Sequence, residues 1–464
     1  MEFNAIIFCG KGSNLSPFSG VKDTGTTKAL LPIANKPVIR YVLEWCDQAP
    51  FKTVTVVCGT DVLADISPVV AKYRDTRGSE LNSTSTLSCI SSSCSTTGSI
   101  LSEVLKTQKF LYKENIVLLP CDFITDVPPQ VFIEIYRGTS DENLGLAISY
   151  NNMFENIDNK ILKTNYTVYA NQADGNTVLL DLYSKNYVAL TKFLKIRTQL
   201  IWRYPETRVS TNLLDAFIFF VNFKIFDIIA GQKDSFFNNR SANKIKRDIA
   251  RRSWSHSTPK ETVGLFVLPK ESVFARCNNL SVYMEVNRFF LKKHARQNAN
   301  LTSGQKSKDN KNAAIAGADC VIGQDTELGD RTNVKRSVIG NHCRIGKKCR
   351  ITACILLDGV TLEDDVHLEN CIIGKKAKLE VKCRLVNCYV EGSYIVGKDV
   401  NLKGETLTNI SLEKFEGEEG ELEIENASDI DDNEVLYSET DSEPTNDADD
   451  TDNGSFDSEF VFAN

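Results

Sequence analysis

The sequence predicts an α/β protein in which a doubly wound, Rossmann-like domain is followed by a left-handed parallel β-helix. Between residues 4 and 295, short apolar runs alternate with stretches of helical periodicity, as in a sheet covered by helices. From residue 313 onward an aliphatic side chain recurs at every sixth position, as in Ile322, Leu328 and Val334. Three such hexads are expected to build one triangular coil of a parallel β-helix.

Length and charge divide the chain into four expected segments. At 464 residues it is too long for one ordinary core. We expect the α/β domain over residues 1–295, a polar linker over 296–312, the β-helix over 313–410 and a disordered acidic tail over 411–464. The tail holds twenty Asp or Glu against one Lys, whereas the rest carries 53 basic and 41 acidic residues. The basic body suits an acidic partner or nucleic acid, for which the tail would compete; a tail that only aids solubility explains the same charges.

Compartment and redox state follow from the absence of two signals in this sequence. Neither a charged-then-apolar leader nor an apolar run of membrane-spanning length is present, so we expect a cytosolic protein without membrane contact. The fourteen cysteines are then expected to be reduced and partly buried. Three close cysteine pairs lack a second ligand pair at zinc spacing, so no structural zinc is expected. These pairs are Cys89/Cys94, Cys343/Cys349 and Cys383/Cys388.

The first strand is expected over residues 5–9 and leads into a glycine-containing loop. The apolar run stops at Gly10 and Gly12, and a long polar loop then delivers Lys28. Glycines let backbone N–H groups approach an anion closely, and a lysine beyond the loop can neutralise phosphate charge. This pattern predicts a phosphate-type loop, although a single Gly-x-Gly is also an ordinary turn after a buried strand.

The next elements are expected to repeat a strand–helix–strand unit. A helix begins after Pro37, and residues 53–58 form a buried strand. Residues 62–73 are expected to be helical with a break near Pro68, and the Ser/Thr-rich residues 76–97 to form a loop.

A buried strand over residues 115–120 is expected to end in an acidic turn that contains Asp122. Ligands of doubly wound sheets bind at the carboxyl ends of strands, so Asp122 lies where a metal-binding carboxylate would. A role as a turn or helix-cap residue explains an aspartate at this point equally well.

The second half of the domain is expected to end in a basic helix. It follows strands over 144–150 and 213–220, surface hairpins over 151–211 and a short helix over 223–230. The helix over 243–254 is expected to expose Lys244, Lys246, Arg247, Arg251 and Arg252. Such a helix can bind RNA, but a solvated face is favoured because no aromatic residues are interleaved for base stacking. We therefore expect no direct contact with nucleic acid.

The opening stretch resembles the signature of the sugar-phosphate nucleotidyltransferases, A-A-G-x-G-T-R-L-x-P followed by P-K-x-L-L-P and N-K-P. Residues 8–17, 27–32 and 35–37 lie on this pattern. The resemblance implies a nucleotidyltransferase-like fold and, for an active member, a sugar-nucleotide pyrophosphorylase that uses Lys28 and Asp122 with magnesium.

Three departures from this pattern indicate a degenerate pocket. Asn14 stands where the enzymes place an arginine to hold the nucleoside triphosphate, and residues 151–211 contain no Glu-Lys-Pro. Residues 276–280, ahead of Tyr283 and Asn287, carry no carboxylate where the enzymes have a second metal-binding aspartate. We expect a nucleotide-pocket-like site of Gly10, Gly12, Lys28 and Asp122 without catalytic residues, metal or cofactor.

Hexapeptide β-helices also occur in acyltransferases, which use a histidine as a general base. His342 and His367 are the candidates, but surface histidines are the favoured interpretation because no coenzyme pocket can be identified. The other common use of such coils is subunit assembly.

The combination of both domains is shared by pyrophosphorylases and by the gamma and epsilon subunits of eukaryotic translation initiation factor 2B, and it resembles the gamma type. The resemblance rests on residues 120–126, 214–216, 244–254 and 276–287, and on a short acidic tail where epsilon has a helical exchange domain. It implies a non-catalytic subunit of the guanine-nucleotide exchange factor for initiation factor 2. Its implied partners are the epsilon, alpha, beta and delta subunits and the GTPase itself. The alternative is an active pyrophosphorylase.

Overall fold

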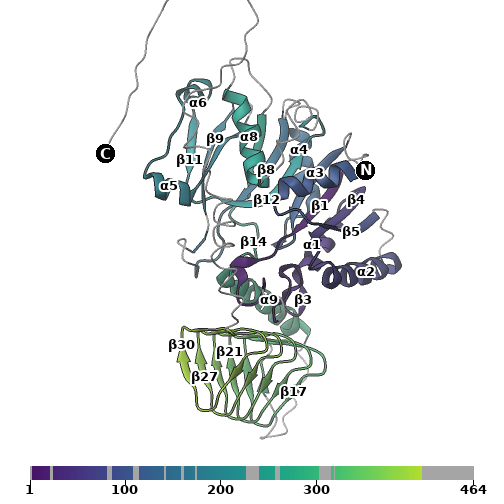
Figure 1. Ribbon diagram of the computed structural model, residues 1–464, viewed down its shortest axis with the longest axis vertical. Helices are drawn as coiled ribbons and strands as arrows, with labels where there is room; N and C mark the ends of the chain where they lie inside the picture. Colours follow the sequence, from purple (N-terminus) through teal and green to yellow (C-terminus); the bar gives the residue numbers. More distant parts are fainter. Residues whose placement is uncertain are drawn as a thin grey trace, which may run out of the picture.

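The computed structural model describes two parts of the chain, an α/β domain and a β-helix that lies against it with helix α9 in between (Figure 1). The described residues are 3–20, 24–80, 86–107, 114–139, 143–157, 161–162, 164–172, 175–225, 240–255, 262–301, 315–317 and 319–409. The acidic tail, most of the expected helix over 223–230 and most of the expected linker lie outside them.

A ten-stranded mixed sheet forms the centre of the α/β domain, in the order β11-β9-β10-β13-β8-β12-β6-β1-β4-β5. Its strands are β1 (Phe3–Cys9), β4 (Thr53–Gly59), β5 (Thr86–Ser92), β6 (Asn115–Pro120), β8 (Asn143–Tyr150), β9 (Asn165–Asn171), β10 (Thr177–Ser184), β11 (Thr207–Ser210), β12 (Leu214–Val221) and β13 (Thr262–Val267). Strands β5, β4, β1 and β6 are parallel, and β12 is antiparallel to both of its neighbours. In β1, Ile6 packs into one core cluster and Ile7 into another, because both faces of the sheet are covered.

Helices and short strands complete the domain. The helices are α1 (Val38–Cys46), α2 (Leu63–Glu80), α3 (Thr97–Thr107), α4 (Pro129–Gly138), α5 (Lys185–Thr191), α6 (Thr198–Arg203), α8 (Ala242–Ser255) and α9 (Leu280–Leu301), with 3-10 turns η1 (Ser13–Leu15) and η2 (Lys28–Leu30). Two small antiparallel pairs join β2 (Pro32–Ile33) to β3 (Lys36–Pro37) and β7 (Phe123–Thr125) to β14 (Phe274–Arg276). The expected doubly wound α/β architecture is confirmed.

Three local expectations differ from the structure. The Ser/Thr-rich stretch contains strand β5, which extends the sheet beside β4 and buries Leu87. Helix α2 runs through Pro68 without a break, because Ile66 and Val70 on either side are buried against the core and offset the lost hydrogen bond. Helix α9 continues to Leu301, into the stretch expected as a linker.

The β-helix is three-sided, and each side is a parallel sheet. The β15–β30 sheet holds β15 (Ile315–Ala316), β18 (Asn333–Lys335), β21 (Arg350–Thr352), β24 (His367–Glu369), β27 (Arg384–Val386) and β30 (Asn401–Lys403). The β16–β31 sheet holds β16 (Val321–Ile322), β19 (Val338–Ile339), β22 (Ile355–Leu356), β25 (Ile372–Ile373), β28 (Tyr389–Val390) and β31 (Thr406–Leu407). The β17–β29 sheet holds β17 (Glu327–Leu328), β20 (Arg344–Ile345), β23 (Thr361–Leu362), β26 (Lys378–Leu379) and β29 (Ile395–Val396).

One coil contains 17 residues, so the expectation of three full hexads was wrong by one residue. Arg350 pairs with His367, and His367 pairs with Arg384, each 17 positions apart. The shortfall lies at the corner after the β15–β30 sheet, where a single residue with positive φ, such as Ala353 (φ 54) or Asn370 (φ 56), turns the chain. Cys343 and Cys349 are completely buried, as expected of corner fillers.

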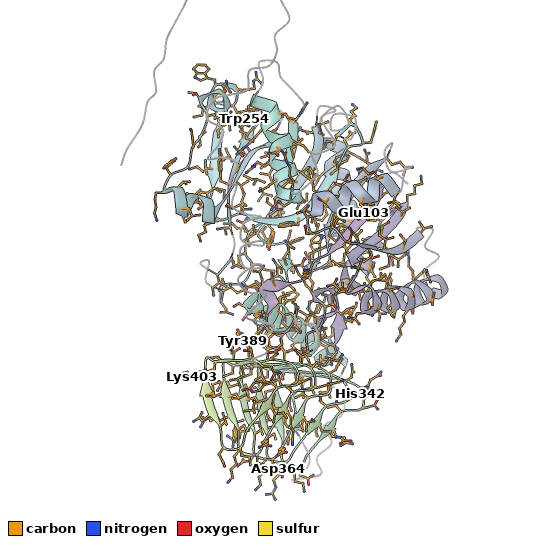
Figure 2. The ribbon with its side chains drawn as sticks, viewed as in Figure 1. Glu103, Trp254, His342, Asp364, Tyr389 and Lys403 are labelled. Carbon is orange, nitrogen blue, oxygen red and sulfur yellow. The ribbon has the colours of Figure 1, made fainter. Side chains whose placement is uncertain are left out.

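The β16–β31 sheet attaches the β-helix to the α/β domain. Its outward Val338, Ile355 and Ile372 belong to the same hydrophobic cluster as the core of that domain. Figure 2 shows Tyr389 of this sheet on the side that meets α9, where its ring packs edge-on against Phe18 at 6.3 Å. Within the described residues, no helix combines the length and apolarity needed to cross a bilayer.

Candidate functional site

The candidate site begins where β1 ends, in a loop that folds back on itself. Gly12 has φ +83, and a Cβ there would lie 2.6 Å from Ser19 Oγ and 2.8 Å from Lys28 Cβ. Gly12 is therefore required both by its backbone conformation and by the approach of Lys28. Gly10 is exposed, and a Cβ there would meet nothing within 4 Å. Asn14 is also exposed.

The structure brings Lys28 and Asp122 into direct contact. Lys28 Nζ lies 2.9 Å from Asp122 Oδ2 and donates to Asn278 Oδ1 at 2.6 Å. The carboxylate is fully buried and Lys28 is 7% exposed, so this pair is shielded from water. Asp122 follows β6 at the carboxyl end of the strand, where the expected ligand site lies.

Arg276 is the residue that the sequence analysis missed. Its guanidinium donates to Asp122 from Nε to Oδ1 at 3.2 Å, and from one terminal nitrogen to Oδ1 at 2.9 Å and to Oδ2 at 3.2 Å. Strand β14 places Arg276 there because it pairs with β7, which directly follows the Asp122 turn. The sequence did contain a signal. Arg276 stands where the resembling enzymes have their second metal-binding aspartate, and a cation at that position can form an ion pair with Asp122.

An aromatic ring covers the guanidinium. The ring of Phe217 lies 4.2 Å from the Arg276 guanidinium carbon, within the range of a cation–π contact. Phe217 has φ 56 at a bulge of β12, an unfavourable conformation for a bulky residue. Asp215 Oδ1 accepts a hydrogen bond from the Phe217 backbone N–H at 2.8 Å and holds this turn.

The electrostatics of the site favour a permanently ionised Asp122. Burial on its own would raise the pKa of this carboxyl, but the charges of Arg276 and Lys28 outweigh it and lower the pKa to about 2. Burial would likewise lower the pKa of Arg276, but Asp122 holds it above its ordinary value. The side chains of Lys28, Asp122 and Arg276 thus form one ion-paired unit of two cations and one anion.

Helix α9 fixes the segment that follows Lys28. Tyr283 Oη donates to the Pro32 carbonyl at 2.5 Å, and Asn287 Oδ1 accepts from the Ala34 backbone N–H at 2.9 Å. Asn35 Nδ2 in turn donates to the Ile339 carbonyl of the β-helix at 2.6 Å. The loop that carries Lys28 is therefore clamped between the pocket and the second domain.

These residues do not fit a magnesium ion. Magnesium needs free carboxylate oxygens, but both oxygens of Asp122 accept hydrogen bonds from cations, and among the described residues the charges that act on Asp122 are those of Arg276 and Lys28. Within the described parts of the chain, no group of three or more His, Cys, Asp or Glu residues is arranged to hold a metal. The guanidinium of Arg276 supplies the positive charge that a metal would bring.

The basic helix differs from the expected solvated face. All five of its basic side chains are buried or half-buried. Lys246 Nζ lies 2.5 Å from Asp215 Oδ2, and Arg251 Nε lies 2.9 Å from Asp181 Oδ1, so these charges tie α8 to the sheet. This correction removes the basis for an RNA-binding helix.

The two β-helix histidines lie apart from the pocket. His342 occupies a corner with φ 55, and its side chain is 71% exposed. Figure 2 shows it at the rim of the β-helix. His367 lies on the outward row of the β15–β30 sheet. Surface histidines, the favoured interpretation, describe both.

Comparison with known proteins identifies relatives of both domains. A family model described as "EIF2B subunit epsilon LbH domain" matches residues 300–405. Over 362 residues the chain is 27% identical to translation initiation factor eIF2B subunit gamma of Schizosaccharomyces pombe, covering 72% of this chain and 74% of that protein. The subunit of the same name from Dictyostelium discoideum is 22% identical over 420 residues, covering 74% of this chain and 88% of that protein.

A solved structure was also found. It is a putative glucose-1-phosphate thymidylyltransferase from Bacillus anthracis in complex with a sucrose, 13% identical, with a TM-score of 0.44, covering 66% of this chain and 98% of that chain. The family model confirms the left-handed β-helix, and the two gamma subunits confirm the resemblance found in the sequence. The chain is therefore similar, over more than 70% of its length, to two proteins named eIF2B subunit gamma.

Proposed function

We propose that this chain is a non-catalytic subunit of the guanine-nucleotide exchange factor that reloads translation initiation factor 2 with GTP, in the position of the gamma subunit. The observation that carries the proposal is the similarity to two proteins named eIF2B subunit gamma, each over more than 70% of this chain. Such a role places the chain in the cytosol.

In this proposal the pocket is an inactive remnant of a nucleotidyltransferase site. The support is the ion-paired unit of Lys28, Asp122 and Arg276, which occupies both oxygens of the buried carboxylate. Phosphoryl chemistry with magnesium would require that carboxylate to be released from two cations. Gly12 then serves to close the loop on Lys28, and Gly10 has no part in the site.

Exchange itself requires no covalent step. An exchange factor accelerates GDP release by binding the nucleotide-free GTPase more tightly than the loaded form. We assign the exchange domain to an epsilon subunit and give this chain a scaffolding role beside it, with the alpha, beta and delta subunits completing the complex. The clamped loop between pocket and β-helix suits a rigid scaffold, because both domains share one hydrophobic cluster.

Purification of the tagged chain from its native cytosol, followed by identification of the co-purifying proteins, tests the partners. We expect the other four exchange-factor subunits and initiation factor 2. Release of labelled GDP from initiation factor 2 is then measured with the complete complex and with a complex reconstituted without this chain. Equal rates in the two reactions would contradict the proposal, as would isolation of the chain without any translation factor.

The alternative, an active pyrophosphorylase, has a direct assay. The purified chain is incubated with sugar 1-phosphates, nucleoside triphosphates and Mg²⁺, and pyrophosphate release is compared with that of a Lys28→Ala, Asp122→Ala control. We expect no release above the control. Release that depends on both residues would establish the pyrophosphorylase instead.

A further inference from the structure

The three faces of the β-helix differ in the polarity and charge of their outward side chains. The β16–β31 sheet is apolar and buried against the α/β domain. The β17–β29 sheet carries charges of both signs, and its cations are paired: Arg344 Nε lies 3.8 Å from Glu327 Oε2, and Lys378 Nζ lies 3.0 Å from Glu363 Oε1. The β15–β30 sheet remains, and its charges are not balanced.

Two outward rows run across the β15–β30 sheet, because alternate residues of each strand face outward. The strand register gives one row as Asn333, Arg350, His367, Arg384 and Asn401. The other row is Lys335, Thr352, Glu369, Val386 and Lys403. The rows contain four lysines or arginines, one histidine and a single carboxylate.

The four cations of this face are exposed and without recorded ion pairs. Lys335, Arg350, Arg384 and Lys403 are each exposed, and among the described residues none of them has a salt bridge. Arg350 and Arg384 flank His367 in adjacent, in-register strands, which lie about 4.8 Å apart in a parallel sheet. Like charges aligned in this way destabilise a sheet unless an anion neutralises them.

We propose that the outward face of the β15–β30 sheet binds the acidic tail of the same chain, residues 411–464. The tail has twenty Asp or Glu against one Lys, so its charge is opposite to that of the face. The described chain ends on the final coil, the coil that also carries Lys403. There Asn409 donates its backbone N–H to Glu391 Oε2 at 2.6 Å, which anchors the point of departure.

The tail is long enough for this contact. The six strands of the face span about 24 Å at the usual strand spacing, whereas a chain of 54 residues can reach up to about 180 Å. A tether of this length presents the tail at an effective concentration on the order of millimolar. Weak exposed ion pairs then suffice, because they act several at a time.

The same face is poorly suited to single-stranded nucleic acid. Such binding combines cations with aromatic side chains on which bases stack. The outward rows contain no Phe, Tyr or Trp, and the histidine is their one ring. An acidic peptide needs no stacking surface.

Zero-length carbodiimide coupling in the full chain tests the proposal, because it joins a lysine amine to a carboxylate in direct contact. The decisive lysine is Lys335, which lies four strands from Lys403 and is remote from the tail in sequence. At low salt we expect amide links from Lys335 to carboxylates in residues 411–464, at least about fivefold more abundant than links from Lys378 to the same residues. At 500 mM salt the yield should fall about fivefold or more, because exposed charges are screened. Mixing isotopically light and heavy chains separates links within one chain from links between chains.

Matched variants separate this face from general charge attraction. Arg350→Gln with Arg384→Gln should reduce the Lys335 link at least about threefold. Arg344→Gln with Arg137→Gln, which removes the same charge from exposed sites elsewhere, should leave it unchanged. Equal links at Lys335 and Lys378, equal effects of the two variants, or links only between chains would each overturn the proposal. Binding of single-stranded RNA to this face with equal affinity in the presence and absence of the tail would also overturn the proposal.

Discussion

The exchange of Arg276 for methionine tests the ion-paired unit most directly. Methionine keeps much of the side-chain volume but removes the charge, which leaves the fully buried Asp122 with Lys28 as its remaining cation. Removing one partner of a buried ion pair typically costs 3–5 kcal/mol. We expect a loss of about 3 kcal/mol in the free energy of unfolding at pH 7, at the low end because Lys28 still neutralises part of the charge.

The pH dependence of the free energy of unfolding gives an independent value for the stabilisation by ionised Asp122. The pKa of Asp122 is lowered to about 2 in the folded chain, against about 3.9 in an unfolded one. A lowered pKa means that the stabilisation is present above about pH 4 and is lost as the pH falls towards 2. This linkage amounts to about 2.5 kcal/mol at neutral pH. In Arg276→Met this acid-induced loss should be smaller, because one of the two cations that lower the pKa is gone and the folded and unfolded pKa values lie closer together.

Urea unfolding followed by tryptophan fluorescence measures both effects, at pH 7 and at a series of pH values down to 3. Trp45 is a suitable probe because its ring lies 5.2 Å from that of Phe123, the residue after Asp122. Arg137→Met is the matched control, since Arg137 forms an exposed ion pair with Glu134 and should change stability by less than about 0.5 kcal/mol. If Arg276→Met were as stable as this control, the reasoning on the buried unit would be refuted.

Three further predictions follow from single positions. Arg276→Asp places a second carboxylate beside Asp122 and should create a weak Mn²⁺ site, detected by electron paramagnetic resonance; the unmodified chain should show none, and equal signals would contradict the fit argument. Gly12→Ala should destabilise the chain by about 2 kcal/mol or more because φ is +83, whereas Gly10→Ala should be nearly neutral in thermal unfolding. Gly392→Ala should loosen the junction of the two domains, because a Cβ there would lie 2.3 Å from a carbonyl oxygen of the α/β domain. Faster limited proteolysis between the domains is the expected readout, and an unchanged cleavage rate would count against it.

The domain architecture was predictable because its signals are local and repeated. Aliphatic residues six apart, such as Ile339 and Ile345, reveal the β-helix without knowledge of any distant contact. The 17-residue coil was missed because the shortened corner has no sequence signature: its position with positive φ is occupied by Arg336, Ala353, Asn370 and Asn387 in successive coils. Sequence composition does not distinguish that conformation. Strand β5 was missed because its serines and threonines are typical of loops, and only its pairing with β4 makes it a strand.

The candidate site was predictable in part for a different reason. Lys28 and Asp122 follow strands that neighbour each other in the sheet, so their meeting follows from the fold. Arg276 lies 154 positions from Asp122, and its contact depends on the β7–β14 pair, which no local pattern indicates. The ion pair of Arg276 with Asp122 can be recognised only when β7 and β14 are placed side by side in the fold.

The 17-residue coil also determines how this part of the chain can change length during evolution. Removal or duplication of one complete coil would leave every remaining side chain on its own face, since each coil contacts only its neighbours. A gap of one residue inside a strand would instead turn aliphatic side chains outward and bring charged ones into the dry interior. Viable insertions and deletions in this region should therefore come in multiples of a full turn or be confined to the corners.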